Sequence, residues 1–233
     1  MHIVILGDSW GEPNWRCPQP GFTDQGHVSV LLRQWGARVS NYSISGGSNY
    51  STWWSYQTHD QDTEAPDWII WFHTDMARDF NWPHLHGIDR SQNWHYEDVL
   101  AKTARSVYKR CSEIWQGKNR PPLILVEGQS QRVMPLFTEY FTAMHVIADW
   151  RAQLVGTELP STQMIGPMVG QGQTFFKGCR DSLEQQNQWI DDVETVMRAM
   201  QKSDLFVDNC HPGDRAHKML FEYLVQYFRA NPI

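Results

Sequence analysis

The sequence has no cluster of basic residues, and acidic residues outnumber basic ones. Its 233 residues include 20 Lys and Arg against 26 Asp and Glu, which gives a formal net charge of −6 at pH 7. Proteins that bind nucleic acid usually gather Lys and Arg on one surface to contact phosphates. We therefore expect no nucleic-acid partner.

Long hydrophobic runs are also missing. The longest apolar stretches, such as residues 68–72, are far shorter than the roughly 20 residues that a membrane-spanning helix needs. The N-terminus has no basic segment, apolar helix and small-residue cleavage site of the kind that directs secretion. We expect no membrane partner and a cytoplasmic location.

Cysteine is scarce, and no CxxC pair is present, so neither a disulfide framework nor a structural zinc site is indicated. The four cysteines are widely spaced: Cys17, Cys111, Cys179 and Cys210. His84 and His86 form an alternating pair, with His73 and His95 further away in the sequence, but two histidines without a CxxC or HExxH motif do not define a metal site. We expect no metal and no organic cofactor.

Short apolar runs alternate with stretches of helical periodicity along the whole chain, which predicts a parallel sheet covered on both faces by helices. The predicted strands are His2–Leu6, Arg38–Ile44, Asp67–Phe72, Pro122–Glu127 and Thr162–Ile165. Helical periodicity covers residues 28–35, 100–115, 137–148, 183–200 and 216–228. We predict one domain over residues 1–233, a three-layer α/β/α sandwich with a mostly parallel sheet of about five strands.

Polar and glycine residues follow four of the predicted strands. They are Ser9, Gly46-Gly47, His73-Thr74-Asp75 and Glu127-Gly128-Gln129. Ligands of such sheets bind at the carboxyl ends of the strands, so these residues should share one edge. Two long segments without periodicity, at about 10–25 and 76–93, lie beside them. We interpret both as pocket walls or a partial lid, with a surface excursion of no consequence as the alternative.

Ser9, Asp208 and His211 supply the three groups that make a serine nucleophilic near neutral pH. A hydroxyl attacks poorly unless a neighbouring imidazole takes its proton, and the imidazole needs a carboxylate to hold its tautomer. The alternative is that Ser9 only caps a turn and His211 only caps a helix.

These motifs together resemble the SGNH (GDSL-type) hydrolase superfamily. Gly7-Asp8-Ser9 matches the first block, Asn41 to Gly46 the second and Asp208 to Pro212 the last. The resemblance implies a flavodoxin-like α/β/α fold and a serine esterase that needs no cofactor. It assigns Ser9 as nucleophile, His211 as base, Asp208 as the orienting carboxylate, and the backbone N–H groups of Ser9 and Gly46 to the oxyanion hole.

The third block departs from the family pattern, because Thr74 stands where the family has an asparagine that donates to the oxyanion. A threonine hydroxyl can donate one hydrogen bond, so we expect Thr74 as a third oxyanion donor. The departure keeps a second hypothesis open, a catalytically weak or inactive carbohydrate-binding or structural module. Acyl transfer to a sugar hydroxyl is a third.

The expected substrate is a small acyl ester, with an acetyl group on a carbohydrate as the first guess. Twelve tryptophans, several of them near the predicted site loops, motivate this guess because exposed indole rings stack on sugars. The residues expected to contact substrate are Trp10, Asn49, His73, Asp75 and Gln129.

Three charged residues near the site admit more than one role. Asp8 follows a strand, where a carboxylate more often accepts backbone N–H bonds than acts in catalysis. Arg78 and Asp79 could pair with one another or with substrate, and the sequence does not decide between these roles.

Overall fold

The computed structural model describes residues 1–13, 25–62, 64–74, 76–81, 96–127, 134–142, 145–147, 205 and 211–233. Its strands are β1 His2–Leu6, β2 Arg38–Asn41, β3 Trp68–His73, β4 Leu123–Glu127 and β5 His145–Ile147. Its α-helices are α1 Val28–Gln34, α2 Asn49–His59, α4 Tyr96–Gly117, α5 Met134–Phe137 and α8 Asp214–Ala230, and a 3-10 helix, η1, spans Met76–Asn81.

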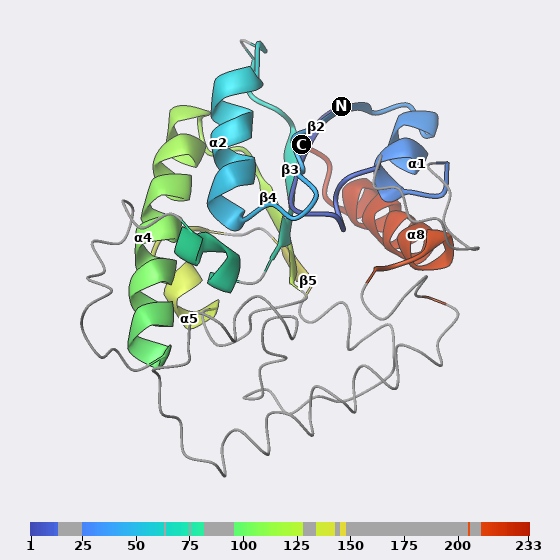
Figure 1. The fold of residues 1–233 in the computed structure, drawn as a ribbon. Helices are drawn as coiled ribbons and strands as arrows, with labels where there is room; N and C mark the ends of the chain where they lie inside the picture. The colour runs from blue at the N-terminus through green and yellow to red at the C-terminus, as the bar shows by residue number, and fades with distance from the viewer. Residues whose placement is uncertain are drawn as a thin grey trace.

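The five strands form one sheet in the order β2-β1-β3-β4-β5, and every pair is parallel. Helices α1 and α8 cover one face of this sheet, and α2, α4 and α5 cover the other (Figure 1). The predicted three-layer α/β/α architecture is therefore confirmed. In this strand order the connections reverse direction between β1 and β3, and ligands of such sheets bind at the carboxyl ends of the strands on either side of that point.

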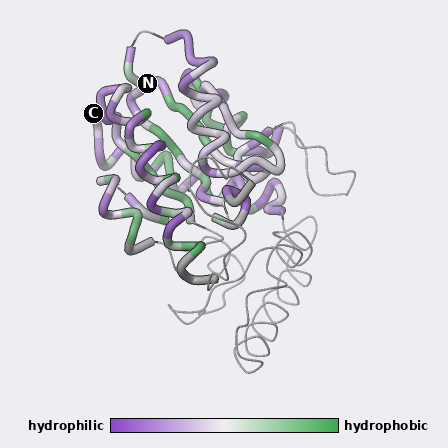
Figure 2. The backbone as a smooth tube through the Cα atoms, turned by 60° about the vertical axis from the view of Figure 1, so that its left-hand side comes forward, coloured by the Kyte–Doolittle hydropathy of each residue, from purple (hydrophilic) through white to green (hydrophobic). Residues whose placement is uncertain are grey.

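Strand β1 is apolar after its first residue because both faces of the sheet are covered. Its side chains alternate between two separate cores. Ile3 and Ile5 pack with residues of α1 and α8, whereas Val4 and Leu6 pack with residues of α2 and α4. In Figure 2 the hydrophobic residues gather in the strands at the centre of the molecule, and the surrounding helices carry many hydrophilic residues. The central strands are thereby fixed from both sides, which holds the loops at their ends in place.

Helix α8 confirms the periodicity predicted for residues 216–228. Its buried side chains are Ala216, His217, Leu220, Leu224, Val225 and Phe228, which recur every three or four residues on one face. Met219 and Tyr223 lie on the exposed face. Among the described helices, none is long and apolar enough to cross a membrane.

The helix predicted at 137–148 is not formed by the described residues of that region, 137–142 and 145–147. Helix α5 ends at Phe137, a turn follows, and His145–Ile147 pairs with β4 as the edge strand β5. Short apolar segments have similar spacing in a buried helix and in a strand, so periodicity alone did not separate the two. The strand predicted at 162–165 and the helix at 183–200 lie outside the described residues.

Helix α2 is a feature that the sequence prediction missed. It begins after Ser48, whose side chain accepts a hydrogen bond from the N–H of Ser51, while the Ser51 hydroxyl accepts one from the N–H of Ser48. This reciprocal pair is a capping box built with serine in place of the usual Glu or Gln, so the sequence lacks the usual signature of the motif. The segment predicted as a loop at 76–93 begins with η1, and its remainder lies outside the described residues.

The packing of α8 can be tested on two residues of the same helix. Leu224→Ala removes a fully buried side chain, so we expect the free energy of unfolding to fall by about 2–5 kcal/mol. Met219→Ala, on the exposed face, should change it by no more than about 0.5 kcal/mol. Urea unfolding followed by circular dichroism measures both values. Equal effects of the two substitutions would contradict the packing described here.

Candidate active site

Ser9 lies in a tight turn directly after β1. Gly7 has φ +155°, and a side chain there would lie 2.6 Å from Cβ of Phe72, so the close approach of β1 to β3 requires glycine. The N–H of Gly11 closes the turn on the carbonyl of Asp8 at 3.0 Å. Ser9 is 8% exposed and lies at the carboxyl edge of the sheet.

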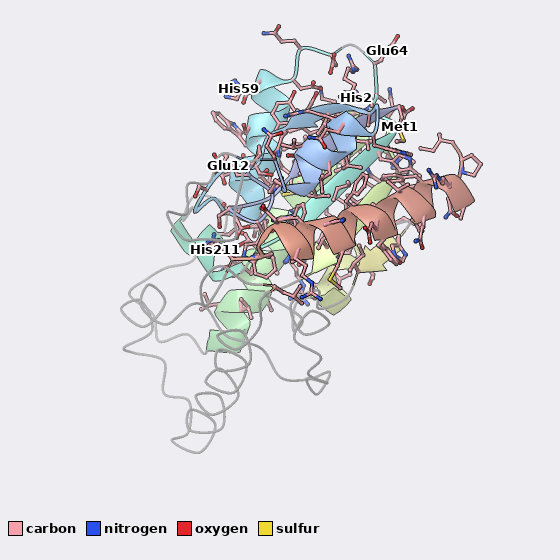
Figure 3. The ribbon with its side chains drawn as sticks, turned by 90° about the vertical axis from the view of Figure 1, so that its right-hand side faces the viewer. Met1, His2, Glu12, His59, Glu64 and His211 are labelled. Atoms are coloured by element: carbon pink, nitrogen blue, oxygen red, sulfur yellow. The ribbon has the colours of Figure 1, made fainter. Side chains whose placement is uncertain are left out.

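His211 meets Ser9 across nearly the whole length of the chain. The distance from Ser9 Oγ to His211 Nε2 is 2.9 Å, and the two residues are 202 positions apart. His211 lies just before α8, and Figure 3 shows it at the N-terminal end of this helix, away from Met1 and His2. A hydroxyl and an imidazole at this distance are placed for proton transfer.

The hydrogen bond from Gly213 N–H to the carbonyl of Leu205, at 2.7 Å, fixes the segment between His211 and α8. Asp208, predicted to orient the imidazole, lies outside the described residues, as do Asp75 and Gln129. Their predicted roles therefore stay predictions.

Asp8 is the hydrogen-bond acceptor that holds the turn of residues 8–11, which carries Ser9. It is 2% exposed, and its Oδ1 accepts from the N–H of Trp10 at 3.0 Å. Its Oδ2 accepts from the hydroxyl of Thr74 at 2.8 Å and lies 3.0 Å from Nη1 of Arg78. This confirms the structural role expected for Asp8, and it also connects the end of β1 to the end of β3.

Thr74 does not have the role that we expected. Its hydroxyl has one hydrogen, and that hydrogen is donated to the carboxylate of Asp8. A carboxylate is a stronger acceptor than a neutral carbonyl group, so Asp8 holds the hydroxyl in this orientation. In the observed arrangement Thr74 therefore does not supply the third oxyanion donor.

Asn49, expected to contact substrate, instead fixes the loop that carries Thr74. It is fully buried at the start of α2, and its Nδ2 donates to the Thr74 carbonyl at 3.0 Å and to Oδ2 of Asp79 at 3.1 Å. Its Oδ1 accepts from the N–H of Thr74 at 3.0 Å. With its amide bonded in this way inside the protein, Asn49 positions the site rather than binding ligand.

The described aromatic residues expected at the substrate are also buried. Trp10 is 4% exposed and belongs to the core between the sheet and α8. His73 is 3% exposed, and its Nε2 lies 2.8 Å from the hydroxyl of Tyr108. Burial lowers the pKa of His73 to about 3, so its imidazole is neutral at physiological pH. Both residues are part of the scaffold under the site.

The second loop at the site is a turn from Ile44 to Gly47. The N–H of Gly47 bonds to the carbonyl of Ile44 at 2.7 Å, and Gly46 between them has φ +68°, a conformation that favours glycine. Gly46 is exposed, and its N–H has no hydrogen-bond partner among the described residues. That N–H is therefore free to donate to a ligand.

Arg78 and Asp79, whose roles the sequence left open, bind different partners. Arg78 pairs with Asp8 and donates to the Gly47 carbonyl at 3.3 Å. Asp79 accepts from the N–H groups of Asn49 and Tyr50, at 3.2 and 3.0 Å, at the N-terminus of α2. Complete burial nevertheless raises the pKa of Asp79 to about 6.

A buried histidine that the sequence analysis did not single out, His27, anchors the turn of residues 8–11 to α1. Nδ1 of His27 accepts from the N–H of Ser29 at 3.2 Å, so Nε2 carries the proton and donates to the Trp10 carbonyl at 3.2 Å. The ring of His217 from α8 lies 4.2 Å from that of His27, centroid to centroid. Burial lowers the pKa of His27 to about 4, which keeps this contact uncharged.

The arrangement can perform nucleophilic chemistry with its own residues. A hydroxyl, an imidazole and a backbone N–H that has no partner in the described part of the chain occupy one edge of the sheet, at the carboxyl ends of β1 and β2. Within the described ranges, no group of three or more His, Cys, Asp or Glu side chains is placed to hold a metal ion.

Among known proteins, similarity to this chain is found with solved structures. No protein-family model and no curated protein matches the chain. A carbohydrate esterase whose active site "displays divergent catalytic and non-catalytic binding functions" aligns over 99% of this chain and 65% of its own, with 15% identity and a TM-score of 0.49. The acetyl xylan esterase AlAXEase aligns over 97% and 99%, with 13% identity and a TM-score of 0.44.

AlinE4, an SGNH-hydrolase family esterase, aligns over 83% of this chain and 95% of its own, with 15% identity and a TM-score of 0.41. These are similarities of fold at low identity. The chain has the α/β/α architecture and the Ser9–His211 pairing that its resemblance to the SGNH hydrolases implies.

The buried carboxyl of Asp79 predicts a pH effect on stability. Because its folded pKa, about 6, lies above the ordinary value of 3.8, its contribution to stability is fully present below about pH 4 and is lost as the pH rises through 6. We expect the free energy of unfolding of the parent, relative to Asp79→Asn, to decrease by about 2–3 kcal/mol between pH 4 and pH 7. Urea unfolding of both proteins at the two pH values measures this change, and a difference that does not vary with pH would contradict it.

Proposed function

We propose that this protein is a serine esterase that hydrolyses small acyl esters through a covalent acyl-enzyme. The observation that carries the proposal is the distance of 2.9 Å between Ser9 Oγ and His211 Nε2. A serine hydroxyl becomes a useful nucleophile only when a base within hydrogen-bond reach takes its proton. These two residues come from opposite ends of the sequence, and the fold brings them together at the edge where ligands of parallel sheets bind.

In the proposed reaction, Ser9 Oγ attacks the ester carbonyl carbon while His211 Nε2 accepts the hydroxyl proton. The carbonyl oxygen becomes an oxyanion, to which the N–H groups of Ser9 and Gly46 donate hydrogen bonds. His211 then returns the proton to the leaving alcohol, and water attacks the acyl-enzyme by the same route in reverse. Asp208 would hold the imidazole with the proton on Nδ1.

The Ser9–His211 pair supports ester hydrolysis but does not identify the natural ester. A small acyl group on a carbohydrate remains our proposal, but the described tryptophans near the site do not support it, because Trp10 and Trp53 are buried in the two cores. Trp54, on α2, is 46% exposed, which makes it the most exposed of Trp10, Trp53 and Trp54.

A catalytically weak binding module is the second candidate, and the position of Thr74 favours it. Its hydroxyl is committed to Asp8, and loss of one oxyanion donor typically lowers turnover about a hundred- to a thousandfold. Binding a ligand needs no such donor. Rapid covalent labelling of Ser9 by a fluorophosphonate would decide for the enzyme, because an unactivated hydroxyl does not react at a comparable rate.

Removal of the nucleophile tests the proposal directly. We expect Ser9→Ala to lower the turnover of an aryl acetate by about 10⁴- to 10⁶-fold, with the melting temperature little changed. Ser55→Ala, which removes a hydroxyl from α2, is the matched control and should keep the parent rate. Equal turnover by Ser9→Ala and the parent would exclude the assignment.

Ser9 and His211 should also behave as one unit. Ser9 needs His211 to take its proton, and His211 has no proton to take without Ser9. We therefore expect the double variant Ser9→Ala/His211→Ala to lose about as much turnover as either single variant. Steady-state rates of the three variants at pH 8 provide the test. Losses that multiply in the double variant would show that the two residues act independently.

A further inference from the structure

Arg78 lies beside the site, and part of its guanidinium group has no hydrogen-bond partner among the described residues. Its Nη1 lies 3.0 Å from Oδ2 of Asp8 and donates to the Gly47 carbonyl at 3.3 Å. Both contacts use the same nitrogen. Nε and Nη2, which carry three further N–H donors, have no partner among the described residues, and the side chain is 21% exposed.

The two partners of Arg78 are the immediate neighbours of the proposed catalytic groups. Asp8 precedes Ser9, and Gly47 follows Gly46. The guanidinium group therefore lies between the turn of residues 8–11 and the Gly46 turn. Nη1 has an acceptor in each turn, which fixes this end of the guanidinium group.

Arg78 also shares an acceptor atom with Thr74. The Thr74 hydroxyl and Nη1 of Arg78 both bind Oδ2 of Asp8, at 2.8 and 3.0 Å. This places the cation next to the position from which the SGNH family pattern implies a third oxyanion donor. Arg78 thus brings N–H donors close to Thr74, whose only hydroxyl hydrogen is already donated to Asp8.

We propose that Arg78 is the third oxyanion donor, and this inference rests on the proposed esterase function. As Ser9 Oγ bonds to the carbonyl carbon and its proton passes to His211, the π electrons of the carbonyl move onto oxygen. A free N–H of Arg78 donates to that oxygen without transferring its proton, because guanidinium stays protonated. When the intermediate collapses, the electrons return to the carbon, the bond to the alcohol breaks, and His211 protonates the alcohol.

A different role for Arg78 would use the same contacts. It could only position Asp8 and the Gly47 carbonyl, and so hold the two turns together. The two roles differ in what they require of the substrate: a donor to the oxyanion acts on the carbonyl oxygen itself, whereas a positioning residue does not.

A thionoester substrate, in which sulfur replaces the carbonyl oxygen, distinguishes an oxyanion donor from a positioning residue. Sulfur accepts hydrogen bonds weakly, so an oxyanion donor accelerates an oxoester more than the matched thionoester. We expect Arg78→Gln to lower kcat for an aryl acetate about a hundred- to a thousandfold, with KM changed less than tenfold. The ratio of oxoester to thionoester rates should fall at least tenfold.

Two further variants complete the experiment. Arg78→Lys keeps a cation beside Asp8 but lacks the second guanidinium nitrogen, so the rate ratio should fall severalfold even if Arg78→Gln does not fold. Arg110→Gln removes the same charge from an exposed pair with Glu113 on α4 and should leave the ratio unchanged. Circular dichroism and the melting temperature check that each variant is folded.

The outcomes are distinct. If turnover depends on Ser9 but the rate ratio is the same in the parent and in both Arg78 variants, Arg78 is a positioning residue and this inference is wrong while the esterase proposal stands. If the parent shows no Ser9-dependent turnover and no fluorophosphonate labelling, the esterase proposal fails and the inference fails with it.

Discussion

The hydrogen bond between Ser9 and His211 is the contact on which the proposed esterase function depends. The two residues are 202 positions apart in the sequence. The distance between Ser9 Oγ and His211 Nε2 therefore depends on the whole fold and not on a local motif. Ser9 is placed by the end of β1, and His211 by the start of α8. Burial of one face of α8 against β1 and β3, together with the contact of His27 with the Trp10 carbonyl, keeps these two points in register.

Asp8 organises the other half of the site. One buried carboxylate receives a backbone N–H, a hydroxyl and a guanidinium nitrogen, and these donors come from the β1 turn, from the end of β3 and from η1. Each donor offsets part of the cost of burying the charge. The carboxylate thereby ties three segments together at the point in the sheet where the connections change direction, and Asn49 secures the same loop from α2.

Much of this arrangement could be predicted from the sequence. The alternation of strands and helices indicated the sheet and its two covered faces, and the strand ends indicated which residues share one edge. The sequence does not show which partner a side chain's hydrogen bonds go to. It therefore predicted Thr74 as an oxyanion donor and Asn49 as a substrate contact, whereas Thr74 binds Asp8 and Asn49 binds the Thr74 carbonyl. Arg78 could not be assigned, because its position depends on how η1 folds back onto Asp8. Residues 145–147 were misassigned because short apolar segments look alike in either element.

The shared oxygen of Asp8 has a consequence for how this site can vary during evolution. Positions 74 and 78 both satisfy one carboxylate, so a change at either alters what the other must do. An asparagine at position 74 would carry an amide donor of its own, so the donor role that we propose for Arg78 would become redundant. We expect homologues to exchange the two residues together, so that threonine with arginine and asparagine without it form alternative, self-consistent pairs.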